Sequence, residues 1–344
     1  MDQFAQLPTE ERQLYFQQAV ARLGRLTAQL VEKDFWVCWT LKRLFSLDEF
    51  GSHLTFKGGT SLSKVYRVIE RFSEDLDVSI ERGFLGFGGE NEPENGQSGK
   101  EQQRRVKKLK KACQAVIVEK IQPQLESAIG AQLGASGDWR ISLDLDDPDR
   151  QTLLFHFPPA IRDGLSPYFA RSVKIELGAR SDHYPVEDAT LSPYLYDAIP
   201  EALDECQVTV RVLCVTRTFW EKATILHVLH HQPIKKPIRK GQSRHLYDLY
   251  RLAKHDVCEK ALADLGLLRR VAQFKSVFFK SSWAKYDEAK PGTLRLVPTA
   301  ARMDELKRDY QSMEPMFFGD AIEFEEIISG LAELQCRINA VDVS

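Results

Sequence analysis

The chain has 344 residues, of which 43% are hydrophobic and 28% are charged, and its formal net charge is -2. This composition supplies a substantial core and predicts a globular protein of two domains, or of one large domain with appendages. The balanced charge excludes a globally basic nucleic-acid binder, so any site for a polyanion must be a local basic patch.

The cysteines and the N-terminal segment indicate the compartment. The 6 cysteines are widely spaced and include no C-x-x-C pair, which predicts reduced thiols rather than disulfides or a zinc site. The opening segment "MDQFAQLPTEERQLYFQQAV" is acidic and amphipathic, and no apolar run approaches the roughly 18 residues of a membrane span. We therefore expect a cytoplasmic protein without membrane contact.

The first part of the chain is predicted to contain helices followed by a strand, a helix and a strand. Helical spacing from Thr9 to about Phe45 predicts two helices, with Thr9 as an N-cap. "HLTFKGG" is typical of a short strand that ends in glycines, "SLSKVYRVIERF" of an amphipathic helix, and "DLDVSI" of an alternating strand.

The remainder is predicted to continue the sheet and then to become helical. The glycine-rich residues 83–99 indicate a mobile loop, and a long helix should run from Lys100 until the glycines at 130–137 break it. "WRISLDLD", "TLLFHF" and "RSVKIELGAR" predict three more strands, and "VTRTFWEKATILHVLHH" and "SRHLYDLYRLAKH" predict later helices. We expect an α+β domain over residues 1–199 and a mainly helical domain over 200–344.

Two aspartates on the "DLDVSI" strand are the first candidate site residues. Alternation places Asp75 and Asp77 on one face and directs Leu76, Val78 and Ile80 into the core. Two carboxylates about 7 Å apart on a strand can share a divalent cation, and hard oxygen ligands favour Mg²⁺ or Mn²⁺ bound together with substrate phosphates. A solvated acidic strand edge is the alternative.

The glycines before this strand suit a phosphate contact. Gly58 and Gly59 allow close approach of the backbone, and Thr60 and Ser61 add donors at the start of the following helix. A P-loop is excluded, because Lys64 follows a serine instead of a glycine and has no serine or threonine after it. The predicted order is a triphosphate grip, a spacer helix and metal-binding carboxylates.

This layout resembles the nucleotidyltransferase superfamily, and several motifs together resemble the AbiEii/AbiGii toxin family, which includes the mycobacterial MenT toxins. The similarity runs from about residue 28 to residue 255. The motifs that carry it are "VEKDFWVCWTL", "FKGGTSLSKVY", "RFSEDLD", "VKIELGAR", "FWEKATILH" and "RHLYDLYRL".

The resemblance implies a fold and an activity. It implies a polymerase-beta-like mixed sheet flanked by helices, with the helical C-terminal domain completing the site. It also implies metal-dependent transfer of NMP from an NTP, with Mg²⁺ or Mn²⁺, to an acceptor such as the 3′ end of tRNA. The role would be that of a toxin in an abortive-infection (phage-defence) toxin-antitoxin system, with its antitoxin encoded nearby. Nucleotide transfer to a protein, and nucleotide binding without turnover, remain alternatives.

Further site residues follow from the same resemblance and from strand alternation. Glu176 is the preferred third carboxylate, because it lies opposite the core-facing residues of its strand; Asp144 and Asp146 are alternatives. Lys222 and Asp248 match a family lysine and aspartate, with Lys222 expected on the triphosphate. Asp248 could orient Lys222 or Arg244, or form an ordinary helical salt bridge with Arg244.

The remaining predictions concern side chains near the nucleotide or on the surface. Ser73 matches a family serine near the nucleotide, and at least one of Lys57 and Lys64 is expected to reach phosphate. Glu32, Lys33 and Asp34 match a family signature; a solvated helix face is the simpler expectation, and support of a partner or of the site is the alternative. The basic helix is predicted to contact RNA phosphates, and a face that only solvent contacts is the alternative. Its basic residues are Arg104, Arg105, Lys107, Lys108, Lys110 and Lys111.

Overall fold

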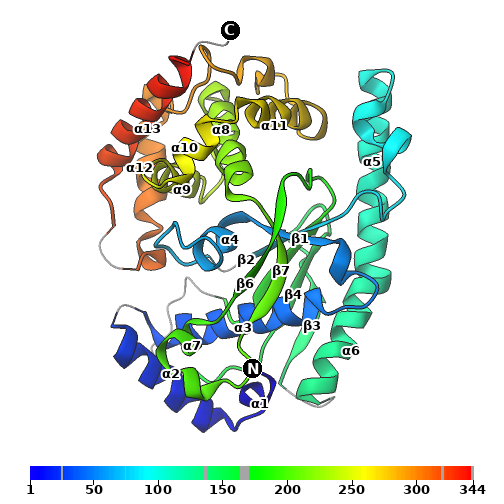
Figure 1. Cartoon of the computed structure of the whole chain (residues 1–344), viewed down its shortest axis with the longest axis vertical. Coiled ribbons are helices and arrows are strands. Elements are labelled where there is room, and N and C mark those ends of the chain that lie inside the picture. Colours follow the sequence, from blue (N-terminus) through cyan, green and yellow to red (C-terminus); the bar gives the residue numbers. More distant parts are fainter. Residues whose placement is uncertain (25, 74, 135–137, 163–169, 319–320, 342–344) are drawn as a thin grey trace. The chain divides into compact units, whose positions relative to one another are not determined.

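The computed structural model describes residues 1–24, 26–73, 75–134, 138–162, 170–318 and 321–341 (Figure 1). The chain forms two compact units. Unit 1 contains Met1–Val65, Phe72–Glu92 and Arg105–Val212, and unit 2 contains Tyr66–Arg71, Pro93–Arg104 and Leu213–Ser344. The short segment Tyr66–Arg71 therefore belongs to unit 2, although unit 1 precedes and follows it in the sequence.

Unit 1 is built around a mixed sheet of 7 strands in the order β3-β4-β5-β2-β1-β7-β6. β2 pairs in parallel with β5 and β1 in parallel with β7, whereas β1/β2, β3/β4 and β4/β5 are antiparallel. The strands are β1 (Leu54–Lys57), β2 (Asp75–Ile80), β3 (Arg140–Leu143), β4 (Thr152–His156), β5 (Val173–Gly178), β6 (Val186–Leu191) and β7 (Val208–Leu213). The predicted helix-flanked mixed sheet is confirmed.

Helix α3 covers the apolar face of this sheet. The indole of Trp36 stacks on Phe157 with ring centroids 5.6 Å apart, and that of Trp39 stacks on Phe155 at 5.9 Å. Both tryptophans are fully buried, and burial of a ring of this size contributes roughly 4–6 kcal/mol of transfer free energy. The helices of unit 1 are α1 (Asp2–Ala5), α2 (Thr9–Leu23), α3 (Ala28–Phe45), α4 (Gly58–Lys64), α6 (Gln122–Leu133) and α7 (Tyr194–Ala198), together with α5 (Gly99–Val116) from Arg105 onward.

The opposite face of the sheet is polar. Along β2, Leu76, Val78 and Ile80 are buried, whereas Asp75 and Asp77 are partly exposed. β5 alternates in the same way, with its apolar residues buried and Lys174 and Glu176 partly exposed. The predicted alternation of both strands is confirmed, and it leaves a charged surface for the site.

Unit 2 is almost entirely helical. α8 packs against α9, α10 and α11, and α13 packs on α9. The helices are α8 (Val215–His231), α9 (Arg244–Ala253), α10 (Val257–Leu262), α11 (Leu265–Phe278), α12 (Met303–Gln311) and α13 (Phe324–Asn339). Among the described residues, no helix is both long enough and apolar enough to span a membrane.

Several predicted boundaries were wrong, most importantly around α4. The helix predicted from Ser61 to Phe72 begins at Gly58 and ends at Lys64. The chain then turns, and Arg67 takes a φ of +52°, because residues 66–71 pack within unit 2 instead of continuing the helix. Helical periodicity cannot reveal this, since Val68 and Ile69 are buried in the non-helical segment as well.

Smaller errors occur elsewhere. Pro8, rather than Thr9, is the N-cap of α2, and α6 passes through Gly130 to Leu133. A π-helical stretch at Ile117–Ile121 joins α5 to α6. Strands β6 and β7 were not predicted. β3 ends at Leu143, so the aspartates that follow lie in a turn rather than on the strand.

Candidate active site

Three charged side chains form a row across the polar face of the sheet. Lys57 on β1 pairs in register with Asp77 on β2, which in turn pairs with Glu176 on β5. The Lys57 Nζ lies 3.9 Å from Asp77 Oδ1. Residues in register on neighbouring strands point to the same side, so three residues that are far apart in the sequence share one surface.

Lys174 links one further acid, Asp144, to this row. Its Nζ lies 3.2 Å from Glu176 Oε1 and 3.7 Å from Asp144 Oδ2. Burial lowers the pKa of Lys174, but the carboxylates of Glu176, Asp75 and Asp144 together outweigh this effect and leave that pKa raised. Asp144 thus lies near Glu176, whereas Asp146 is exposed in the turn after β3.

Gly58 is required by its contact with Asp77. Its φ is +79°, a left-handed conformation that strains other residues, and a Cβ there would lie 1.9 Å from Asp77 Oδ2. The glycine turn and the acidic strand therefore approach each other closely. This juxtaposition agrees with the predicted order of glycine turn and carboxylates, although the intervening helix is shorter than expected.

The hydroxyls after the glycines are used within the fold. Thr60 Oγ1 donates to the carbonyls of Ser73, at 3.1 Å, and Asp75, at 2.6 Å. Ser61 Oγ donates to the carbonyl of Gly58 at 2.8 Å. Both side chains are buried. Thr60 therefore fixes the start of the acidic strand, and a phosphate contact at residues 58–61 would depend on backbone N–H groups.

Lys64 is held in a buried ion pair. Its Nζ lies 2.8 Å from Asp34 Oδ1 and 3.5 Å from the centroid of the Tyr194 ring. Burial lowers the pKa of Lys64, but Asp34, Cys38 and Tyr194 together outweigh this effect and leave that pKa raised. The charge of Lys64 is thus already compensated in the interior by Asp34. Of the two predicted lysines, Lys57 is therefore the better placed to meet a phosphate.

The prediction of a solvated Glu32-Lys33-Asp34 face was wrong, because all three are buried. Glu32 accepts the N–H groups of Ala160 and Ile161, at 2.5 and 3.1 Å. Lys33 donates to the carbonyl of Ala170, and Asp34 also accepts the N–H of Tyr194. The triplet ties separate segments to α3, and the partners are backbone groups that the local sequence does not reveal.

Unit 2 contains a buried charge cluster around Asp248. Arg71 donates from Nε to Oδ1 and from Nη2 to Oδ2, each at 2.8 Å. Lys222 Nζ donates to Oδ2 at 2.8 Å and lies 3.1 Å from His245 Nδ1. Asp248 is completely buried, and the Arg71 and Lys222 side chains are 1% and 8% exposed.

The electrostatics of this cluster follow from its burial. Burial alone would raise the pKa of Asp248, but Arg71 and Lys222 hold it well below its usual range. Burial lowers the pKa of Lys222, and Arg71 adds to that effect against the opposing Asp248. Burial and Lys222 also keep the pKa of His245 well below its usual value, so the neutral ring accepts the lysine's hydrogen bond.

Sequence reasoning selected Lys222 and Asp248 but missed Arg71 and His245. Asp248 uses its carboxylate oxygens for Arg71 and Lys222, and Arg244 contributes to the surrounding positive charge. Both missed residues stand inside motifs already quoted, "RFSEDLD" and "RHLYDLYRL". The available signal was the charge of Arg71, four positions before Asp75. Its partner is 177 positions away and could not be inferred.

The carboxylates of unit 1 suit a hard cation held jointly with phosphate. Among the described residues, no group of three or more His, Cys, Asp or Glu side chains converges on a metal position. Mg²⁺, however, is commonly held by one or two carboxylates together with substrate phosphates. Asp75 and Asp77, partly exposed on one strand face, fit that pattern.

Comparisons with known proteins identify the family. A model described as "Nucleotidyl transferase AbiEii toxin, Type IV TA system" matches residues 39–329, most of the chain. The chain belongs to this family. The structure also resembles MenT4, a nucleotidyltransferase toxin from Mycobacterium tuberculosis H37Rv, with a TM-score of 0.54, 18% identity, and coverage of 96% of this chain and 90% of that chain. A search of curated proteins found no match.

Membership of the AbiEii family makes this chain a nucleotidyltransferase of the type IV toxin-antitoxin class. The match begins within α3 and includes both the acidic strand of unit 1 and the Lys222-Asp248 cluster of unit 2. The resemblance to MenT4 supports the fold alone, because the sequence identity of the two chains is only 18%. The predicted fold class and enzyme class are both confirmed.

The basic helix of this AbiEii protein has a solvated side. Lys107, Lys108 and Lys111 are exposed, and no described acidic side chain pairs with them. The other cations are partly used: Lys110 pairs with Asp149, and Arg105 donates to backbone carbonyls. The three exposed lysines are therefore the part of α5 best suited to bind a polyanion.

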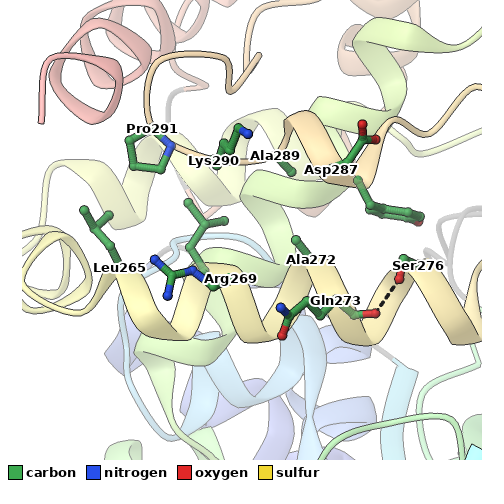
Figure 2. A pocket seen from close by; sticks show the side chains of 11 residues that line it. Leu265, Arg269, Ala272, Gln273, Ser276, Asp287, Ala289, Lys290 and Pro291 are labelled. Atoms are coloured by element: carbon green, nitrogen blue, oxygen red, sulfur yellow. Dashed lines mark hydrogen bonds between the residues drawn. The ribbon is translucent and has the colours of Figure 1, made fainter. Parts of the chain in front are cut away.

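A separate pocket in unit 2 contains none of the predicted site residues. It has a volume of about 650 Å³ and lies between α11 and residues 286–291 (Figure 2). Leu265, Leu268 and Ala272 contribute apolar surface, and Arg269 and Lys290 contribute charge.

Proposed function

We propose that this enzyme transfers NMP from an NTP to an acceptor and requires Mg²⁺ or Mn²⁺ as a cofactor. The reaction would take place on the polar face of the unit 1 sheet. The observation that carries the proposal is the row of Lys57, Asp77 and Glu176 beside the Gly58 turn. Asp75 and Asp77 would hold the metal, with Glu176 as a third ligand or as the base for the acceptor hydroxyl. When bound, the metal would stabilise charge on the attacking and leaving oxygens.

Lys222 and Asp248 are proposed to take part in the same reaction. Lys222 would meet the triphosphate, and Asp248 would orient it through their 2.8 Å hydrogen bond. The family resemblance implies that the helical domain from about residue 200 completes the site.

The triphosphate is proposed to contact residues 57–61 and Lys222. Lys57 and the backbone N–H groups after Gly58 would bind phosphate oxygens, whereas Lys64 would act indirectly through its buried pair with Asp34. Ser73, whose carbonyl accepts from Thr60, and Arg244 are proposed nucleotide contacts. The nucleotide base is left open.

RNA is the proposed acceptor, specifically the 3′ end of tRNA by family resemblance. The exposed Lys107, Lys108 and Lys111 support this choice, since lysines bind the phosphate backbone independently of sequence. The biological role would be growth inhibition opposed by a cognate antitoxin. A protein acceptor is the alternative, and the product assay distinguishes the two.

The central experiment incubates the protein with each labelled NTP, Mg²⁺ and total tRNA, beside the Asp75→Ala variant. We expect a labelled product that RNase removes and protease leaves intact, and that is absent with Asp75→Ala. Label that is lost on protease treatment would indicate a protein acceptor. Transfer that persists in Asp75→Ala would contradict the proposed site.

A second experiment tests the RNA surface. Reversing the charges of Lys107, Lys108 and Lys111 should weaken tRNA binding and reduce the slope of log affinity against log salt by about 0.7–0.9 per lost phosphate contact. The matched control reverses Lys254, Lys260 and Lys280, which are exposed lysines of unit 2. An unchanged slope in the α5 variant would exclude this helix from RNA binding.

A further inference from the structure

We propose that Arg71 is a positioning residue for the triphosphate. By fixing Asp248 from two sides, it would hold the ammonium of Lys222 at the place where the β- and γ-phosphates bind. The inference rests on the proposed function of Lys222. It adds a residue for which the sequence supplied no role, and it assigns Arg71 an indirect effect through Asp248 rather than a contact with the nucleotide.

The geometry of the Arg71 side chain supports this assignment. Its two hydrogen bonds of 2.8 Å engage both oxygens of Asp248, which fixes the plane of the carboxylate. Oδ2 then also accepts the hydrogen bond from Lys222 at 2.8 Å. With the carboxylate unable to rotate, the lysine ammonium has one preferred position. A planar, bidentate contact of this kind is specific to arginine.

The backbone around Arg71 is clamped within unit 2. Arg71 forms an isolated antiparallel bridge with Phe317. The preceding Glu70 donates its N–H to the Tyr247 hydroxyl at 3.2 Å, and its carbonyl accepts the N–H of Phe318 at 3.0 Å. These backbone contacts hold residues 70–71 in place, although the segment has no regular secondary structure. They therefore place the Arg71 guanidinium beside Asp248.

The cluster keeps one cationic group at a fixed and slightly accessible place. Arg71 and Lys222 both bind the carboxylate of Asp248, and the Lys222 side chain is 8% exposed whereas that of Arg71 is 1% exposed. A lysine ammonium is a compact point charge that suits a phosphate. Lys222 is therefore the member of the cluster that would meet a polyphosphate, and Arg71 would act through Asp248.

The experiment compares Arg71→Met and Arg71→Lys with Arg302→Met. Arg302 is a control from the same unit, because it is 4% exposed and pairs with Glu305 at 2.8 Å. Affinities for a non-hydrolysable NTP analogue and for the corresponding NMP are measured by calorimetry with Mg²⁺. Thermal unfolding midpoints are measured in parallel, and binding is measured below the midpoint of each variant.

We expect Arg71→Met to weaken binding of the NTP analogue at least tenfold and to change NMP binding less than twofold, because NMP lacks the phosphates assigned to Lys222. Arg71→Lys should recover part of the loss. Arg302→Met should lower the midpoint but preserve both affinities. Equal losses for NTP and NMP in Arg71→Met, or an unchanged NTP affinity, would overturn the positioning role.

Two further arms keep the result interpretable. If Arg71→Met does not fold, Arg71→Lys decides, since it retains the charge but lacks the second hydrogen bond; unchanged NTP affinity in that variant would also overturn the proposal. The Lys222→Met variant separates failure of the proposed function from failure of the Arg71 role. If Lys222→Met leaves the NTP affinity unchanged, Lys222 does not bind the triphosphate, whatever the Arg71 variants show.

Discussion

The two charged regions of this AbiEii protein differ in exposure and in bonding. In unit 1, the Asp77 and Glu176 side chains are 28% and 41% exposed, and their lysine partners lie at 3.9 and 3.2 Å. In unit 2, Asp248 is fully buried and both cations bind it at 2.8 Å. Loosely paired acids can exchange a lysine for a metal ion, whereas the short hydrogen bonds of the buried cluster hold its geometry.

This difference indicates a division of labour. Partly exposed ion pairs contribute little to stability, about 0–1 kcal/mol each, so the acids of unit 1 are available for ligand binding. Breaking a buried pair leaves uncompensated charge and costs far more. Mutations in unit 1 should therefore change activity with little loss of stability, and mutations in unit 2 should change both.

The largest expected effect is at Asp248. Asp248→Ala should lower the free energy of unfolding by about 3–5 kcal/mol, because it leaves the cations Arg71 and Lys222 buried without their carboxylate. Urea denaturation measures this loss. Glu70→Ala is the control from the same unit, since Glu70 is 55% exposed and pairs with Arg251, and it should cost less than about 1 kcal/mol. Similar losses would erase the proposed distinction.

Asp77→Asn tests the other side of the comparison. We expect transfer to fall about a thousandfold, because removal of a metal ligand forfeits several kcal/mol of charge stabilisation. The free energy of unfolding should change by less than about 1 kcal/mol. Asp188→Asn, an exposed aspartate on β6, is the control. A stability loss as large as that of Asp248→Ala would show that Asp77 is mainly structural.

Gly58→Ala sharpens the comparison by disturbing the acidic row through the backbone. The positive φ should cost about 1–3 kcal/mol, and the new Cβ would displace the Asp77 carboxylate from its present position. Gly86→Ala is a matched control, because Gly86 has a φ of +82° but open space around it. Transfer should fall at least tenfold further in Gly58→Ala. Equal activity in the two variants would mean that backbone strain, rather than displacement of the Asp77 carboxylate, causes the loss of transfer.

The smallest effect concerns pH and His183, which contacts Thr55 at 3.2 Å and Ser79 at 2.8 Å. Burial lowers the pKa of His183 to about 4. The folded state therefore binds fewer protons than the unfolded state between about pH 4 and 6.5. This contribution to stability is complete above pH 6.5 and is lost as the pH falls toward 4.

His183→Gln should accordingly reduce the acid sensitivity of unfolding by up to about 1.4 kcal/mol per pH unit in that range. Denaturation curves at several pH values measure the slope. If His183→Gln has the same slope as the unmodified protein, the ring is not held neutral by its surroundings.

The sequence predicted the local elements of the site well. The alternation of "DLDVSI" and "VKIEL" identified the faces that carry Asp75, Asp77 and Glu176, because side-chain direction along a strand is a local property. The seventeen-residue string "VTRTFWEKATILHVLHH" coincides with α8, Val215–His231. Motif resemblance identified the family. It also selected Lys222 and Asp248, which the structure joins by a hydrogen bond.

Other features were decided only by the tertiary structure. The helix predicted after Ser61 ends at Lys64, because the next residues pack among the helices of unit 2. Glu32, Lys33 and Asp34 have the composition of a surface face, yet they are buried against backbone groups and Lys64.

The sequence by itself determined the chemistry available to this protein: two aspartates on one strand face, a glycine turn before them, and a family lysine and aspartate on later helices. The tertiary structure alone decided which charges meet. Arg71 and Asp248 are separated by 177 positions, and local periodicity carries no information about such a pairing. Whether a charge is solvated or buried depends on the groups that the fold brings to it, so the same residue types became an open acidic row in one unit and a locked ionic cluster in the other.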